Sequence, residues 1–198
     1  MVFLFWIAVI VVVGVAIYFV TNQKRLASQR PVVEELPPLN RTLFTLQIGD
    51  IVQFEDRDWV VEGKLTYDDD GFVWLEYMVQ DGDDIRWLSV SEDDTIEVSW
   101  LESIADDLEI SGKPPKTLEY GGETFTRVES GKANMSRMGT IQKRKAESCR
   151  YYDYEGDGDR VLSVENWDGD IEVSVGYSIR PSQLSLLPGG GGSVYRSM

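Results

Sequence analysis

Residues 86–99 read RWLSVSEDDTIEVS, and residues 160–174 read RVLSVENWDGDIEVS. In both stretches apolar and polar residues alternate, and an acidic turn separates two short runs rich in Val and Ile. Alternation with a period of two is typical of β-strands that bury one face. Each stretch therefore predicts two strands joined by a tight turn, and the chain contains this hairpin twice.

The repetition extends upstream of each hairpin. Val61-Glu62-Gly63-Lys64 matches 128–132 (VESGK) with one insertion, and Tyr77 and Tyr154 each precede an Asp-Gly-Asp turn. The two strands of the hairpin and these two upstream pairs are four matches in the same order, which indicate an internal duplication. We predict an all-β fold with two tandem units, 46–111 and 116–187, joined by a linker at 112–115.

Each unit is small for an independent domain. We therefore expect the two units to pack together with pseudo-two-fold symmetry, as small paired β-barrels or as one larger β-sheet. Only 101–108 has the pattern of a short helix. We favour core packing over an aromatic ligand groove for the tryptophans, because they lie on alternating strand patterns. These tryptophans are Trp59, Trp74, Trp87, Trp100 and Trp167.

The composition excludes several kinds of chemistry. The chain has 198 residues, with 19 Lys and Arg against 34 Asp and Glu, no His and one Cys. Without His, the Ser-His and Cys-His nucleophile pairs are absent. A single cysteine, Cys149, excludes an internal disulfide and a multi-cysteine zinc site. A net charge of −15 repels phosphate backbones, so we expect no nucleic-acid partner. We also expect no cofactor.

Residues 2–20 read VFLFWIAVIVVVGVAIYFV and carry no charge. This length suffices to cross the hydrocarbon core, and we predict a transmembrane helix at 1–21 that anchors the chain in the lipid bilayer. A cleaved signal peptide is the alternative, but no basic residue precedes the apolar run. Because Lys24, Arg25 and Arg30 follow it, the positive-inside rule predicts a single-pass protein with a cytoplasmic C-terminal domain. The membrane would be the plasma membrane, or the thylakoid membrane in a cyanobacterium.

Two further segments are predicted to lie outside the β units. Residues 22–45 contain three prolines, which favour an extended tether. Residues 188–198 begin with Pro188 and four glycines, which predicts a flexible tail.

One string of acidic residues is a weak candidate for a calcium site. Asp153, Glu155, Asp157 and Asp159 alternate along a glycine-containing segment and offer hard oxygen ligands. The flanking helices of an EF-hand are not predicted here, and its twelfth-position Glu is replaced by Val164. A solvated hairpin turn is therefore the favoured interpretation.

Repeated carboxylates could in principle act as acid and base. Glu62 with Glu129, or Glu97 with Glu172, would form related pairs if the two units pack together. Nothing in the sequence places these side chains in a cleft, so we expect no enzymatic activity and assign no catalytic residue. The repeated Ser89 and Ser163 have no neighbouring base and are interpreted as structural.

Basic residues mark two candidate contact regions. Lys24, Arg25 and Arg30 lie next to the predicted bilayer and can contact anionic headgroups. The β units contain one further basic cluster, which can bind an acidic partner or anionic lipid, or form a solvated loop. Its members are Arg137, Lys143, Arg144 and Lys145, with Arg150 nearby.

A set of short motifs carries a family resemblance. The motifs are Leu46-x-x-Gly49-Asp50, Trp59-x-Val61-Glu62-Gly63, Trp74-x-Glu76-Tyr77, Trp87-Leu88-Ser89-Val90, Val128-Glu129-Ser130-Gly131-Lys132-Ala133 and Leu162-Ser163-Val164-Glu165-x-Trp167. They cover most of 46–187, and this region resembles the bacterial family catalogued as domain of unknown function 4178. The resemblance implies a duplicated β domain, often beside a membrane segment, in bacteria including cyanobacteria. It also implies an association with membrane-stress and membrane-protein systems, and it supplies no catalytic residue.

We therefore predict a non-enzymatic, membrane-tethered interaction module. It would serve as an assembly, stability or stress factor for a membrane-protein complex, a photosynthetic one in a cyanobacterium. The alternative is a small-ligand or metal sensor domain that uses a cleft between the two units, and an enzyme with paired carboxylates comes third. A cleft with converging polar groups would favour the sensor, and a flat exposed apolar patch would favour the interaction module.

Overall fold

The computed structural model describes residues 40–104, 107–108, 110, 112–141 and 147–195. The chain divides into two compact units, Met1–Pro37 and Pro38–Met198, and only the second contains described residues. The predicted membrane helix and the basic residues that follow it lie outside the described part. Within that part, no helix is both long enough and apolar enough to cross a membrane.

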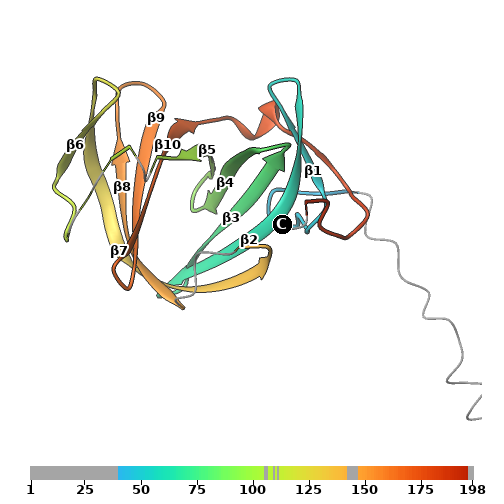
Figure 1. Ribbon diagram of the computed structural model, residues 1–198, viewed down its shortest axis with the longest axis horizontal. Coiled ribbons are helices and arrows are strands. Elements are labelled where there is room, and N and C mark those ends of the chain that lie inside the picture. The colour runs from blue at the N-terminus through green and yellow to red at the C-terminus, as the bar shows by residue number, and fades with distance from the viewer. Residues whose placement is uncertain (1–39, 105–106, 109, 111, 142–146, 196–198) are drawn as a thin grey trace, which may run out of the picture. The chain divides into compact units, whose positions relative to one another are not determined.

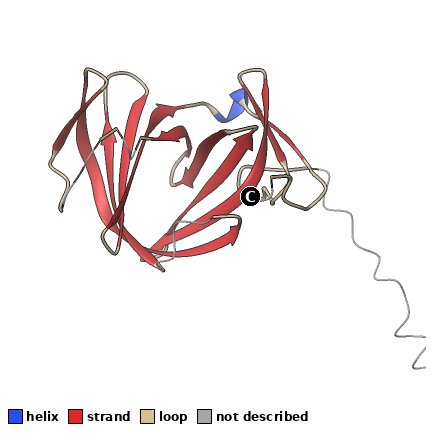
Figure 2. Ribbon diagram, in the orientation of Figure 1, coloured by secondary structure: helices blue, strands red, loops and turns tan. Residues whose placement is uncertain are grey.

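The described residues form eleven strands and one short 3-10 helix, so the predicted all-β class is confirmed (Figure 2). The first five strands are β1 (Ile51–Phe54), β2 (Arg57–Asp69), β3 (Phe72–Asp81), β4 (Asp84–Glu92) and β5 (Ile96–Ser103). The next five are β6 (Thr117–Tyr120), β7 (Glu123–Gly139), β8 (Ser148–Glu155), β9 (Arg160–Trp167) and β10 (Asp170–Ser178). The helix η1 (Pro181–Gln183) and β11 (Ser185–Leu187) follow.

Eight of these strands close into one barrel. Neighbouring strands pair in the order β2-β3-β4-β5-β10-β9-β8-β7, and β7 pairs in turn with β2. The two predicted units therefore share one barrel, and neither closes a barrel of its own. Figure 1 shows β2–β5 on one side and β7–β10 on the other. The two groups of strands meet at two antiparallel seams, β5–β10 and β2–β7.

The β5–β10 seam has local two-fold symmetry. Leu101 and Gly176 each lie two residues beyond the repeated Ile-Glu-Val-Ser sequence, and they are opposite each other in the seam. A two-fold axis between antiparallel strands exchanges the ends of the strands. A side chain at one end of the barrel therefore has its counterpart from the other half near the opposite end.

We predicted a short helix at 101–108, but residues 101–103 are extended and belong to β5. The strand pairing explains this difference. Leu101 lies between Trp87 on β4 and Gly176 on β10, with its backbone engaged on both sides. At Gly176, a Cβ atom would lie 1.9 Å from the carbonyl oxygen of Trp100. Only glycine allows the two strands to approach this closely.

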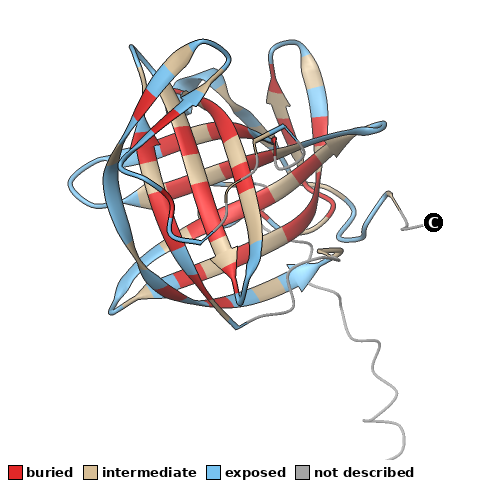
Figure 3. Ribbon diagram, turned by 60° about the vertical axis from the view of Figure 1, so that its left-hand side comes forward, coloured by how far each residue is buried: buried red, intermediate tan, exposed pale blue. Residues whose placement is uncertain are grey.

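Side chains alternate between the two faces of the barrel wall, which gives the banded burial pattern of Figure 3. Each half of the wall buries an apolar core on its outer face. In the first half this core includes Val61, Tyr77, Leu88 and Trp100, covered by Val52 and Phe54 of β1 and by Leu43 and Leu46. In the second half it includes Tyr152, Tyr154, Leu162 and Val175, with Leu118 of β6 and Phe125.

A third apolar cluster lies inside the barrel and draws on both halves. It contains Leu65, Tyr67, Trp87, Leu101, Ala133, Met135, Cys149, Tyr151 and Trp167. The predicted core role of the tryptophans therefore holds for Trp59, Trp87, Trp100 and Trp167. Trp74 differs, because it is only partly buried and borders an internal cavity.

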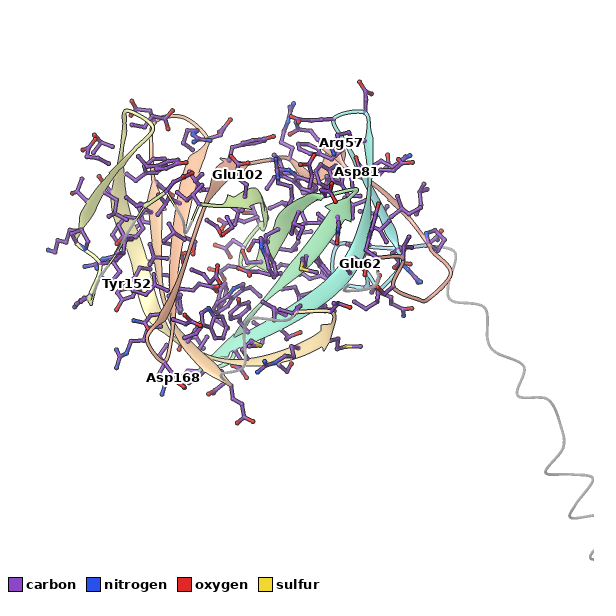
Figure 4. The ribbon with its side chains drawn as sticks, in the orientation of Figure 1. Arg57, Glu62, Asp81, Glu102, Tyr152 and Asp168 are labelled. Carbon is purple, nitrogen blue, oxygen red and sulfur yellow. The ribbon has the colours of Figure 1, made fainter. Side chains whose placement is uncertain are left out.

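The segment after β11 packs against the first half of the barrel, whereas we had expected a flexible tail. The backbone N–H groups of Val194 and Tyr195 donate to Glu62 Oε1 at 2.8 and 3.0 Å. The hydroxyl of Ser193 donates to Glu62 Oε2. Glu62 is only 1% exposed, and it lies at an irregularity in the β2–β3 pairing between Val61 and Gly63. Glu62 is labelled in Figure 4, on the side of the molecule formed by the first half of the barrel.

Candidate functional site: a cavity inside the barrel

One end of the barrel interior is hollow. The cavity has a volume of about 530 Å³ and is bounded by residues from β3, β4, β5, β7, β8, β9 and the end of β10. Phe72 at the start of β3 and Ile96 at the start of β5 are 42% and 40% exposed and lie at its open end. The apolar cluster inside the barrel closes the other end.

The two-fold arrangement places different side chains at the two ends of the interior. Met78 lies opposite Trp87, and both pack in the interior cluster. The counterpart pair in the second half is Glu155 opposite Val161, at the cavity. The positions that carry large apolar side chains at the closed end therefore carry an exposed acid and a smaller aliphatic side chain at the open end.

Two rows of polar residues lie at equivalent places in the two halves of the barrel wall. Ser89 lies opposite Glu76 on one side and Ser99 on the other. In the second half, Ser163 lies in the same way between Asp153 and Ser174. The repeated serines, which we had interpreted as structural, both line the cavity, together with Glu76 and Asp153. The sequence does mark these two carboxylates, because Glu76 directly precedes Tyr77 and Asp153 directly precedes Tyr154, the two repeated tyrosines.

Aromatic residues form one boundary of the cavity. The rings of Trp74 and Tyr67 stack with their centroids 4.6 Å apart and their planes 3° from parallel. Tyr151 meets Trp74 edge-on at 5.1 Å, and its hydroxyl donates to Asp69 Oδ2 at 2.8 Å. Burial, together with this hydrogen bond to Asp69, raises the pKa of Tyr151, which keeps the phenol protonated. The boundary is therefore aromatic, and both of its tyrosine hydroxyls are held by carboxylates, Tyr151 by Asp69 and Tyr67 by Glu76.

Asp153 is an acid of the wall whose pKa is raised. Burial, with the nearby negative charges of Glu165 and Glu129, raises its pKa to about 7. The hydroxyl of Ser163 donates to Asp153 Oδ1 at 2.8 Å, which favours the ionised form but does not offset the burial. Asp153 therefore changes its charge near neutral pH.

Asp153 is partly exposed, whereas two other carboxylates in the wall are almost completely buried. Glu76 is 7% exposed and accepts a hydrogen bond from Tyr67 at 3.0 Å. Glu165 is 6% exposed and accepts one from Trp167 Nε1 at 3.3 Å. Glu97, Glu129 and Glu155 are exposed lining residues. Among the described residues that line the cavity there is no Lys or Arg.

The structure separates the carboxylate pairs considered from sequence. Glu129 borders the cavity, whereas Glu62 is held by the C-terminal segment outside it. Glu97 borders the cavity beside the end of β10, where Ser99 pairs with Ser178. Glu172 lies beyond the opposite end of the same seam, where Ser103 pairs with Ser174.

The calcium candidates are spread over the β8–β9 hairpin. Asp153 and Glu155 line the cavity, while Asp157 and Asp159 are exposed in the turn (residues 156–159). In the described parts of the chain, no group of three or more His, Cys, Asp or Glu residues could hold a metal ion.

The basic candidates are only partly within the described residues. Arg137 is a partly buried residue of β7 opposite Leu65, and Arg150 is exposed on β8. Lys143, Arg144 and Lys145, like Lys24, Arg25 and Arg30, lie outside the described residues. A partner or lipid contact at these positions stays a prediction.

The fold and its interior define a closed eight-stranded β-barrel with a cavity of ligand size. The chain belongs to the family described as Domain of unknown function (DUF4178), whose model matches residues 47–181. The family resemblance inferred from the motifs is thereby confirmed.

The relatives found are mycobacterial. Over 147 residues the chain is 31% identical to an uncharacterised protein of Mycobacterium bovis and to uncharacterised proteins from two strains of Mycobacterium tuberculosis. Each match covers 71% of this chain and 70% of the relative. No solved structure matches the chain.

Proposed function

We propose that the protein is a small-molecule-binding barrel, a carrier or sensor whose binding site is the internal cavity. The observation that carries this proposal is a cavity of about 530 Å³ in which polar groups from both halves of the chain converge. An eight-stranded barrel is just wide enough either to be filled by its own side chains or to hold one small ligand. Binding cavities of about 300–1,000 Å³ are usual for such ligands.

The polar character of the wall supports a binding role over a purely structural one. Buried carboxylates and hydroxyls cost free energy unless they are hydrogen-bonded, so an interior that only supports the fold is expected to be apolar. The closed end of this barrel has that apolar composition. At the hollow end, Glu76, Ser89, Asp153 and Ser163 occupy the wall instead.

Titration of a panel of cationic, neutral and anionic small molecules into the full chain tests the proposal. The readout is the unfolding temperature, because a ligand that binds only the folded state stabilises it. Ser89→Phe places a ring in the cavity and should abolish the shifts. Ser130→Phe is the matched control on an exposed position of β7 and should preserve them. The proposal fails if no molecule shifts the wild type, or if Ser89→Phe responds as the wild type does while folding normally.

The membrane-tethered interaction module stays a second proposal. It is favoured by exposed apolar side chains beside the cavity, where Phe72, Val73 and Val128 are 42%, 47% and 56% exposed. Affinity capture of the tagged full chain in mild detergent should then recover a defined membrane complex. Recovery should be lost for a variant lacking residues 1–39 and reduced by Phe72→Ser with Val73→Ser. Capture of the bare protein alone would count against this role.

A further inference from the structure

The charge of the cavity wall narrows the class of ligand. The acidic side chains come from both halves of the barrel, and the described lining contains no cationic side chain. A ligand that enters this space moves out of water and toward these carboxylates. Their field attracts positive charge and repels negative charge, and the effect is stronger than in water because the surroundings are less polarisable.

Asp153 shows where a positive group would be held. Its Oδ1 atom accepts the Ser163 hydroxyl, while no described group donates a hydrogen bond to Oδ2. Its strongest charged neighbours are the acids Glu165 and Glu129, which disfavour its ionised form. Among the described residues that line the cavity, no cationic side chain is present to pair with this partly buried carboxylate.

The aromatic boundary and the rim suit an apolar body attached to that charge. Trp74 stacks on Tyr67 and makes a T-shaped contact with Tyr151, and Trp74 and Tyr151 both line the cavity. At the open end, Phe72 and Ile96 expose further apolar surface. Aromatic faces also attract cations directly.

We propose that the cavity binds a small organic cation, with its ammonium group paired to Asp153 and its apolar part against Trp74 and Tyr151. This inference rests on the proposed binding function and specifies the ligand's class. A protonated amine fits better than a metal ion, because the described carboxylates include no group of three that could coordinate one. An amine needs only one or two oxygen acceptors and gains from the apolar surroundings.

Calorimetric titration of the full chain at pH 8 with three matched probes tests this inference. The probes are 2-phenylethylamine, the neutral 2-phenylethanol and the anionic 3-phenylpropionate. The amine should bind at least tenfold more tightly than the alcohol, and the carboxylate should not bind. Affinity for the amine should rise between pH 6 and pH 8, because Asp153 must lose its proton to pair with the cation.

Two variants assign the effect to Asp153. Asp153→Asn removes the charge without adding volume and should weaken amine binding at least tenfold, with little change for the alcohol. Asp58→Asn changes an exposed carboxylate on β2 that does not line the cavity, and it should leave both affinities unchanged.

The outcomes separate the two proposals. If the alcohol or the carboxylate binds as tightly as the amine, and Ser89→Phe abolishes that binding, the cavity is a ligand site but the cation inference is wrong. Equal amine affinity in wild type and Asp153→Asn would also overturn the inference. If no probe binds, and no molecule of the wider panel stabilises the chain, both proposals fail.

Discussion

Asp50 joins three segments of the chain through one buried carboxylate. It is 1% exposed and accepts hydrogen bonds from Arg41 Nε at 2.5 Å, Gln47 N at 2.8 Å and Gly189 N at 2.8 Å. The Arg41 side chain is itself 1% exposed. Removal of one partner from a buried ion pair leaves a charge without compensation. We expect Asp50→Ala to lower the free energy of unfolding by about 3–5 kcal/mol, measured by urea denaturation.

The control for this prediction is Asp58→Ala. Asp58 is exposed and accepts one hydrogen bond, from Gln53, at 2.8 Å. Its replacement should change the free energy of unfolding by less than about 0.5 kcal/mol. A similarly small effect of Asp50→Ala would show that the buried pair with Arg41 does not support the fold.

The raised pKa of Asp153 has a consequence for stability. In the folded chain the pKa of Asp153 is about 7, whereas the ordinary value of an aspartate side chain is 3.8. Between these values the folded state binds the proton and the unfolded state has lost it, so the contribution of Asp153 to stability falls as pH rises through about 7. Asn cannot ionise. The free energy of unfolding of Asp153→Asn, measured by urea denaturation without ligand, should therefore rise relative to that of wild type by on the order of 2 kcal/mol from pH 5 to pH 8. A stability difference that does not vary with pH would contradict this.

At the scale of elements, the C-terminal segment acts as a strap on the first half of the barrel. Its hydrogen bonds to Glu62 and Asp50 are made by backbone groups of Gly189, Val194 and Tyr195 and by the Ser193 hydroxyl. Deletion of 188–198 should cost about 2 kcal/mol of unfolding free energy, because several charge-assisted hydrogen bonds are exchanged for bonds to water. Deletion of 196–198 alone retains all of these contacts and is the control for this loss.

A double-mutant cycle checks the cause of this loss. Glu62→Ala should destabilise the full chain but add little to the chain that lacks 188–198. If the two changes are additive, Glu62 does not hold the strap.

The strands themselves were predictable, because alternation and Asp-Gly turns are local signals. The strap was not, because a glycine-rich segment has no strand pattern and its acceptors lie far earlier in the chain.

One of the four repeat matches was also misleading about register. Lys64 lies opposite Tyr77, but the position opposite Tyr154 is held by Arg127 and not by the matching Lys132. A four-residue similarity cannot reveal a shift in pairing, since strand pairing is decided by packing across the sheet.

The site was predictable only in part, for a similar reason. Alternation shows that Ser89 and Leu88 face opposite sides of a strand, but not which side faces a cavity. The outer faces of this barrel wall are apolar cores, and at the hollow end the serines and carboxylates of the wall turn inward. Apolar side chains can face outward here because β1 and β6 cover the outside of the barrel. No local sequence pattern shows which surface a neighbouring strand will cover.

For the whole molecule, closure of the barrel makes the two halves depend on each other. The β2–β7 and β5–β10 seams each pair one strand from either half. The interior cluster also combines Leu65 and Trp87 of the first half with Met135 and Trp167 of the second. Separated halves would expose this apolar surface and leave two unpaired strand edges each.

We therefore expect residues 40–112 and 113–198, produced separately, to lack the dispersed amide NMR spectrum of a packed β protein. Mixed in equal amounts, they should recover dispersion and a single cooperative unfolding transition, because the seams and the interior cluster form only together.

Gly176→Ala in the second fragment should prevent this recovery, since the added Cβ meets the Trp100 carbonyl across the seam. Gly190→Ala, where a Cβ would meet nothing within 4 Å, is the matched control and should permit it. If a fragment alone unfolds cooperatively and gives a dispersed spectrum, that half of the barrel is a domain in its own right. The cavity would then lie at an interface between the halves that can open.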